Sequence, residues 1–73
     1  MDERIVIDPK ICHGKPVVRG TRTPVTVILG ALAGGDTYET IMEDYGITVE
    51  DIRACIAFAN EAISQQSYHP LPV

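Results

Sequence analysis

The sequence of 73 residues lacks several features on which whole classes of protein depend. It has only two cysteines, Cys12 and Cys55, and they are too far apart in sequence to form a C-x-x-C pair. This spacing excludes a cysteine-based zinc framework and a disulfide scaffold, so we expect two free thiols, as in a cytoplasmic protein. No apolar run reaches the roughly 18 residues of a membrane-spanning helix, and residues 1–8 show no signal-peptide pattern.

The sequence also has few groups that could form a metal site or an active site. Cys12 and His13 are adjacent and point differently in an extended segment, and no pair with His69 has the spacing of a zinc site. His13 has no nucleophile or orienting carboxylate placed beside it by sequence. The pair Gly14-Lys15 is followed by proline, where a phosphate-binding loop has serine or threonine. We therefore expect no metal, no cofactor, no small-molecule substrate and no enzymatic activity.

Positive charge is scarce and unevenly distributed. Lys and Arg number six against ten Asp and Glu, for a net charge of −4. Residues 1–22 carry five cations and three carboxylates, whereas residues 23–73 carry one cation and seven carboxylates. Such asymmetry suggests a polyanion or an acidic partner for the N-terminal part. Taken alone, the charge distribution is better explained by acidic, solvent-exposed helix faces than by a partner. Nonspecific nucleic-acid binders usually show a basic footprint over the whole domain, and this sequence does not.

The N-terminal third predicts a small β-hairpin over residues 4–24. Apolar residues 5–7, closed by Asp8-Pro9, are typical of a short strand that ends at a turn. A second extended piece at 16–18 leads into a turn at 19–22, where Gly20 supplies the positive φ that tight turns require. Thr23-Pro24 confines the return arm to an edge or a strand end. So small a sheet is not stable alone.

From residue 25 the apolar spacing changes to that of helices, which we predict at about 27–33, 37–45 and 49–66. Polar residues that cap helix N-termini and glycines that end helices mark their bounds. The predicted caps are Thr26, then Asp36 or Thr37, then Thr48 with Asp51 at its third helical position, and the terminating glycines are Gly34, Gly35 and Gly46. Residues 1–66 form a single domain in this scheme, and residues 67–73 form a flexible tail that Pro70 and Pro72 keep from being helical.

The third predicted helix is apolar on two faces, and residues 54–59 carry no charge. A helix of this kind usually packs against its own domain on one side and another surface on the other. A chain this short buries only roughly 60% of its unfolded surface, so a second subunit would add stability. We therefore expect a homodimer. The candidate interface residues are Ile56, Phe58, Ala59 and Ile63.

The second and third helices, joined by a short glycine-containing turn, have the arrangement of a helix-turn-helix, which places its second helix in the major groove of DNA. Glu50 and Asp51 at the start of that helix would oppose the phosphates. The basic loop would then supply much of the contact. The candidate DNA-binding residues are Lys15, Arg19, Thr21, Arg22 and Arg53.

An alternative gives the two hairpin arginines a structural role. Arg19 and Arg22 would then pair with acids on the helices and hold the hairpin in place, instead of contacting phosphate. The acids available for this are Asp36, Glu39 and Glu43. The sequence leaves both alternatives open.

The segment from Gly14 to Arg22, GKPVVRGTR, resembles the family called domain of unknown function 433 (DUF433). The pattern of that family is glycine, Lys or Arg, proline, two apolar residues and Arg-Gly-Thr-Arg, followed by three helices. The resemblance covers nearly the whole chain. It continues at Gly35, Asp36, Glu39, Tyr45, Thr48, Glu50, Asp51 and Ile52. His13 stands where the family often has a further glycine.

The resemblance implies a mostly α fold, in which a three-helix, homeodomain-like helix-turn-helix unit follows a short N-terminal β-hairpin. It also implies a VapB-type antitoxin, encoded beside a PIN-like nuclease toxin, that acts as a dimer on its own operator DNA. The C-terminal tail would bind the toxin, with Tyr68, Leu71 and Val73 as candidate contacts. The alternative is a protein-interaction or dimerisation module without DNA binding.

Overall fold

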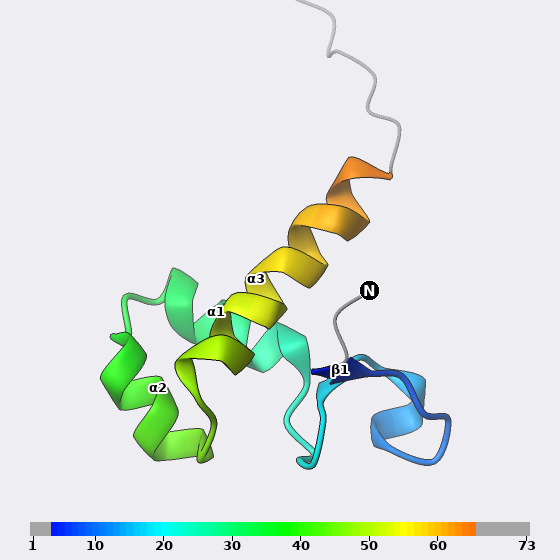
Figure 1. Cartoon of the computed structure of the whole chain (residues 1–73), viewed down its shortest axis with the longest axis horizontal. Helices are drawn as coiled ribbons and strands as arrows, with labels where there is room; N and C mark the ends of the chain where they lie inside the picture. Colours follow the sequence, from blue (N-terminus) through cyan, green and yellow to red (C-terminus); the bar gives the residue numbers. More distant parts are fainter. Residues whose placement is uncertain (1–3, 66–73) are drawn as a thin grey trace, which may run out of the picture.

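The computed structural model describes residues 4–65, which form three helices after a short antiparallel strand pair (Figure 1). The predicted fold class, mostly α with an N-terminal hairpin, is therefore confirmed. The predicted tail at 67–73 lies outside the described residues. In chain order the elements are β1 (Ile5–Val6), a 3-10 turn (Cys12–Gly14), β2 (Val17–Val18), α1 (Val25–Ala33), α2 (Tyr38–Tyr45) and α3 (Val49–Ser64).

The hairpin is built from three short segments. β1 pairs with β2, with Ile5 opposite Val18 and Val6 opposite Val17. The predicted return arm also forms, but only as a single bridge between Val17 and Pro24. Proline has no N–H to extend this pairing, so the chain turns into α1 immediately afterwards.

α1 begins two residues earlier than predicted, and its N-cap is Pro24, not Thr26. The Val25 N–H donates to the Pro16 carbonyl at 2.9 Å, and the Val27 N–H donates to the Pro24 carbonyl at 3.0 Å. These backbone partners satisfy donors that an N-cap side chain would otherwise serve. The early start also brings Val25 into the core, where it is 2% exposed.

The other two helices begin at hydroxyl caps. Thr37 caps α2 by accepting from the Thr40 N–H at 3.2 Å, which decides between the two predicted caps. Gly46 ends α2 at φ +66, in the left-handed region that favours glycine. Thr48 caps α3 as predicted. α3 ends at Ser64, where the Ser64 hydroxyl donates to the Asn60 carbonyl at 2.7 Å, a side-chain bond that competes with helical continuation.

The core lies where the three helices meet β1 and β2. Ile28, Ile41 and Ile52 provide one fully buried isoleucine from each helix, and Val18 of β2 is buried in the same cluster. Ile5 of β1 joins the same cluster. Full burial of one such side chain contributes roughly 1.5–3 kcal/mol. The hairpin is therefore held in place by the helices, which positions its turn and loop.

Candidate nucleic-acid and partner interface

The turn after β2 is a tight β-turn fixed by its own residues. Gly20 has φ +80, and the Thr21 N–H donates to the Val18 carbonyl at 3.0 Å. The Thr21 hydroxyl donates to the same carbonyl at 2.7 Å and accepts from the Thr23 N–H at 3.0 Å. Both functions of the Thr21 hydroxyl are used within the turn, and a contact between Thr21 and phosphate stays a prediction.

The cations of the hairpin are exposed at the surface. The side chains of Lys15, Arg19 and Arg22 are exposed, as is that of Arg53 on α3. The Cys12 thiol donates to the Arg22 carbonyl at 3.2 Å. This bond joins the loop that carries Lys15 to the turn that carries Arg22. The structure therefore connects two parts of the basic loop, and Arg53 belongs to a separate element.

An ion pair joins the residue before β1 to α3 through Arg4, which the sequence analysis did not single out. Its Nη1 lies 3.0 Å from Asp51 Oδ1 on α3. α2, which carries Glu39 and Glu43, lies on the far side of α1 from β1 (Figure 1). The sequence places Arg4 directly before the first predicted strand, but it does not reveal that the start of α3 lies beside this strand. The pair between Arg4 and Asp51 could therefore not be predicted.

Asp51 has a second partner at the start of α3. Thr48 and Asp51 form a capping box, in which the Asp51 N–H donates to Thr48 Oγ1 at 3.2 Å and the Thr48 N–H donates to Asp51 Oδ2 at 3.0 Å. Burial alone would raise the pKa of Asp51, but the hydrogen bonds from Thr48 and the side chain of Arg4 lower the pKa below its ordinary 3.8. One of the two carboxylates at the start of α3 is therefore bound to Arg4 and Thr48, whereas Glu50 is exposed.

The loop before β2 contains a left-handed turn. Cys12, His13 and Gly14 have φ values of +50, +58 and +81, respectively. The left-handed region of positive φ costs a residue with a Cβ atom roughly 1–2 kcal/mol, although histidine occurs there more often than most residues. The turn is closed by the Lys15 N–H, which donates to the Cys12 carbonyl at 3.1 Å. The loop that carries Lys15 thus has a defined conformation.

This turn leads to a prediction about His13. A β-branched residue fits positive φ worst, whereas glycine fits it best and loses only about 0.5–1 kcal/mol through chain entropy. We expect His13→Gly to leave the free energy of unfolding unchanged or slightly raised, and His13→Val to lower it, so that the two variants differ by about 2 kcal/mol. Urea denaturation measures this difference. Lys10→Val, at an exposed position with ordinary φ, is the control, and equal stability of the two His13 variants would contradict the prediction.

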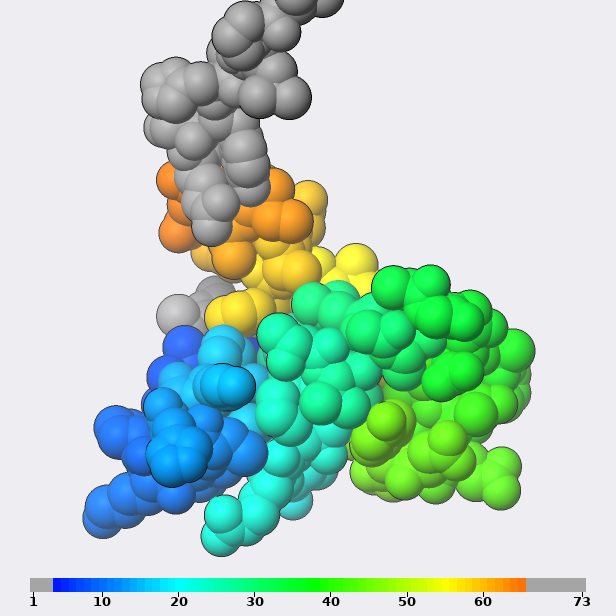
Figure 2. Space-filling model, turned by 180° about the vertical axis from the view of Figure 1, so that it is seen from behind, coloured from blue at the N-terminus to red at the C-terminus, as the bar shows by residue number. Residues whose placement is uncertain are grey.

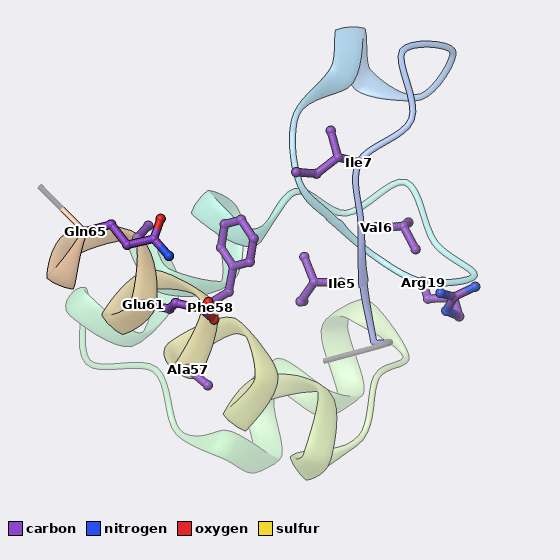
Figure 3. A pocket seen from close by; sticks show the side chains of 9 residues that line it. Ile5, Val6, Ile7, Arg19, Ala57, Phe58, Glu61 and Gln65 are labelled. Atoms are coloured by element: carbon purple, nitrogen blue, oxygen red, sulfur yellow. The ribbon is translucent and has the colours of Figure 1, made fainter. Parts of the chain in front are cut away.

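A groove between β1 and the C-terminal half of α3 was not predicted from the sequence. It has a volume of about 720 Å³. Its walls are Ile5, Val6, Ile7 and Arg19 on the hairpin side, and Ala57, Phe58, Glu61, Ala62 and Gln65 on the α3 side (Figure 3). Ile7 is 61% exposed, so the groove presents apolar surface to the outside. An apolar groove flanked by a cation and a carboxylate is suited to a protein segment.

The candidate dimer residues lie on more than one side of α3. Ile56 and Ile63 are 40% and 55% exposed. Phe58 packs partly against the core and lines the groove, and Ala59 is half-buried. The candidate tail residues Tyr68, Leu71 and Val73 lie outside the described residues.

The thiols, the metal-ligating side chains and the lengths of the helices bear on other kinds of site. Within residues 4–65, neither Cys12, which is half-buried, nor Cys55, which is buried, is in a disulfide. Within residues 4–65 no three His, Cys, Asp or Glu side chains are grouped so that they could hold a metal ion. None of the described helices is long and apolar enough to cross a membrane.

Comparison with known proteins identifies relatives of this architecture. The sequence model of the family described as "Protein of unknown function (DUF433)" matches residues 5–59. A curated protein of Mycobacterium tuberculosis (strain ATCC 25618 / H37Rv), named "Putative antitoxin VapB45", is 36% identical over 52 residues, which are 71% of this chain and 22% of that protein. The chain therefore corresponds to a minor part of this relative.

Two crystal structures share the fold. A DUF433 member protein from Anabaena variabilis superposes with a TM-score of 0.78 at 28% identity, covering 88% of this chain and 64% of that one. The protein Rv2018 from Mycobacterium tuberculosis superposes with a TM-score of 0.66 at 35% identity, covering 71% of this chain and 24% of that one. The hairpin and three helices are thus found within longer chains.

Proposed function

The chain belongs to the DUF433 family, and from that premise we propose that it is an antitoxin-like regulator that binds a protein toxin and its own operator DNA. The observation that carries the proposal is the 36% identity to a protein named as an antitoxin over 71% of this chain. An antitoxin acts by binding, in keeping with a small domain whose distinctive groups are a basic loop and an apolar groove.

In the DNA-binding part of the proposal, α2 and α3 act as a helix-turn-helix. Gly46 and Ile47 form the corner between these helices, and α3 is the helix that enters the major groove. The engagement of Asp51 by Arg4 and Thr48 supports this role, because it reduces the charge repulsion at the start of α3. Lys15, Arg19 and Arg22 contact phosphates from the hairpin, and Arg53 contacts the backbone from α3.

In the toxin-binding part, the partner is a PIN-like nuclease, and the C-terminal residues Tyr68, Leu71 and Val73 contact it. These residues lie outside the described part of the chain. The groove beside β1 provides a second apolar surface for a protein partner. The proposed assembly is cytoplasmic, in agreement with the free thiols.

A second function is favoured by one observation. Glu50 is exposed at the start of α3, where a DNA reader usually presents a cation or an amide. In this alternative the chain is a protein-interaction module without a nucleic-acid role. Arg19 and Arg22 then serve the hairpin or a protein partner.

Salt-dependent DNA binding distinguishes these functions. Four phosphates neutralised by each copy give a slope of log K against log salt of about −3.6, or about −7 for two copies, so the affinity of two copies falls roughly 10⁴-fold between 50 and 200 mM salt. We expect Arg22→Ala to make the slope less steep by about 1 per copy. The measurement is fluorescence anisotropy with DNA from the chain's own upstream region.

Lys10→Ala is the matched control, because it removes the same charge from an exposed position that lies outside the turn after β2. We expect its slope to be that of the unsubstituted chain. A slope near zero for the unsubstituted chain would rule out the DNA role. Co-purification of the neighbouring gene product in that case would favour the interaction module.

A further inference from the structure

β1 is an edge strand of the hairpin. β2 lies on one side of it, and the return arm at Thr23 and Pro24 pairs with the far side of β2. Val18 stands opposite Ile5, and its N–H donates to the Thr23 carbonyl at 3.0 Å. Ile5 and Val18 are therefore the kind of pair that exchanges no hydrogen bonds, so the N–H and C=O of Ile5 point away from β2. Within residues 4–65, no strand pairs with this other edge of β1.

The unpaired edge of β1 faces the groove. Neighbouring side chains of a strand point to opposite sides, and Figure 3 shows Ile5 and Ile7 on one side of the chain and Val6 on the other. All three residues line the groove. A groove lined by consecutive residues lies along the edge of a strand, not over one of its faces. Backbone donors and acceptors of β1 therefore lie beside any molecule that enters the groove.

The opposite wall of the groove is the C-terminal half of α3. This half stands clear of α1 and α2 in two opposite views (Figures 1 and 2). Phe58 and Ala62 give the wall apolar surface, and Glu61 gives it an exposed carboxylate. From Ala57 to Gln65 the wall is about 12 Å long at 1.5 Å per residue, which equals about four residues of an extended chain at 3.4 Å per residue.

We propose that the groove binds an extended segment of a partner protein, which adds as a strand to the free edge of β1. The backbone of the segment pairs with Ile5 and Ile7, and apolar side chains at alternate positions pack against Phe58 and Ala62. A lysine or arginine of the segment lies beside Glu61. This segment gives a chemistry to the partner in the protein-binding part of the proposed function, on which the inference rests.

The charges around the groove support this partner chemistry. Glu61 belongs to the α3 wall, whereas Arg19 lies on the same side of β1 as Val6 (Figure 3). Side chains of an added strand alternate between these two sides. Those that face α3 meet apolar surface and a carboxylate, and those on the other side meet a cation. The segment is therefore apolar and basic toward α3, and neutral or acidic on its other side.

A charge reversal tests the chemistry of the partner. The probe is the synthetic peptide Thr-Val-Thr-Lys-Thr-Val-Thr, blocked at both ends, and a second probe has glutamate in place of its lysine. We expect the unsubstituted chain to bind the lysine probe at least fivefold more tightly, and Glu61→Lys to reverse this preference. Isothermal titration calorimetry measures both affinities.

Glu43→Lys is the matched control for the reversal. It makes the same change at an exposed position on α2, which lies on the far side of α1 from β1. We expect this variant to keep the preference for the lysine probe. Equal binding of the two probes to the unsubstituted chain, or an unchanged preference in Glu61→Lys, would overturn the proposed partner chemistry.

The added strand itself is tested at the backbone. Ile7→Pro removes an N–H from the free edge, whereas Ile7→Val keeps the N–H and a branched apolar side chain. We expect Ile7→Pro to weaken binding of the lysine probe at least tenfold and Ile7→Val to leave it within threefold. In the unsubstituted chain, saturating probe should slow hydrogen exchange of the Ile5 amide at least tenfold, measured by NMR. An Ile5 exchange rate that the probe leaves unchanged would contradict an added strand, whether or not Ile7→Pro folds.

Other occupants of the groove give different results. If a second copy fills it, exchange of the Ile5 amide slows as the chain is concentrated without probe, and the proposal is wrong. If the toxin co-purifies equally with the unsubstituted chain and Ile7→Pro, and the probe does not bind, only this inference is contradicted. If the lysine probe binds as expected but no toxin co-purifies, only the proposed function is contradicted.

Discussion

Replacement of Ile52 by alanine is expected to lower the free energy of unfolding by about 3 kcal/mol, within the roughly 2–5 kcal/mol typical of such core truncations. Ile52 is fully buried and lies on α3 in the cluster that joins all three helices to β1 and β2. A domain of 73 residues has a total stability of only about 4–11 kcal/mol at 0.05–0.15 kcal/mol per residue. The variant should therefore lose a large share of its stability.

Thermal denaturation followed by circular dichroism measures this loss. A change of 1 kcal/mol shifts the Tm of a domain of this size by about 4–8 °C, so Ile52→Ala should melt about 12–24 °C lower. Ile56→Ala is the matched control, because it makes the same change one helical turn later, at a residue 40% exposed. Its effect should be measured at a concentration where both proteins are monomeric. Comparable losses in the two variants would show that the core is not centred on Ile52.

The second large effect is expected at Asp51. Asp51→Ala removes an exposed ion pair worth about 0.2–1 kcal/mol, a favourable charge at a helix N-terminus worth about 0.3–1 kcal/mol, and half of the capping box. We expect the free energy of unfolding at pH 7 to fall by about 2 kcal/mol. Glu50→Ala, which removes a neighbouring exposed carboxylate, should cost less than half as much. Urea denaturation compares the two variants.

The same carboxylate gives a pH dependence with a defined sign. The folded pKa of Asp51 lies below its ordinary value of 3.8, so the folded protein favours the ionised form. This contribution is fully present above the unfolded pKa and is lost as the pH falls through the folded pKa. The stability difference between the unsubstituted chain and Asp51→Ala should therefore be constant above about pH 5 and shrink in more acidic solution. A difference that grows on acidification would contradict the assignment.

The sequence predicted the helices because their signals are local. Thr48 and Asp51 stand at the spacing of a capping box, and the box forms. Gly46 follows the last apolar residue of α2 and adopts the left-handed conformation that ends it. The start of α1 was missed because its N-terminal donors are satisfied by the Pro16 and Pro24 carbonyls, and a backbone partner leaves no trace in residue type.

The candidate site was less predictable, because it depends on contacts between distant segments. The basic residues of the loop could be identified, but the internal use of the Thr21 hydroxyl could not. The Arg4–Asp51 pair joins residues 47 positions apart, and the groove forms where β1 meets the second half of α3. The residue pattern within one helix or strand contains no information on the ion pair or on the groove. The proposed roles of Lys15, Arg19, Arg22 and Arg53 remain predictions for the DNA-binding experiment.

The distance in sequence between β1 and α3 has a consequence for the order in which the chain folds. The helices form contacts between near neighbours, which close quickly. β1 is synthesised before α3, which carries Asp51, the ion-pair partner of Arg4, and Phe58, which lines the groove with β1. β1 can pair with β2 earlier, but its side that faces the groove stays uncovered until α3 is complete. A chain interrupted before residue 51 lacks Asp51 and the α3 wall of the groove, so truncated translation products should be recognised by chaperones and proteases more readily than the finished protein.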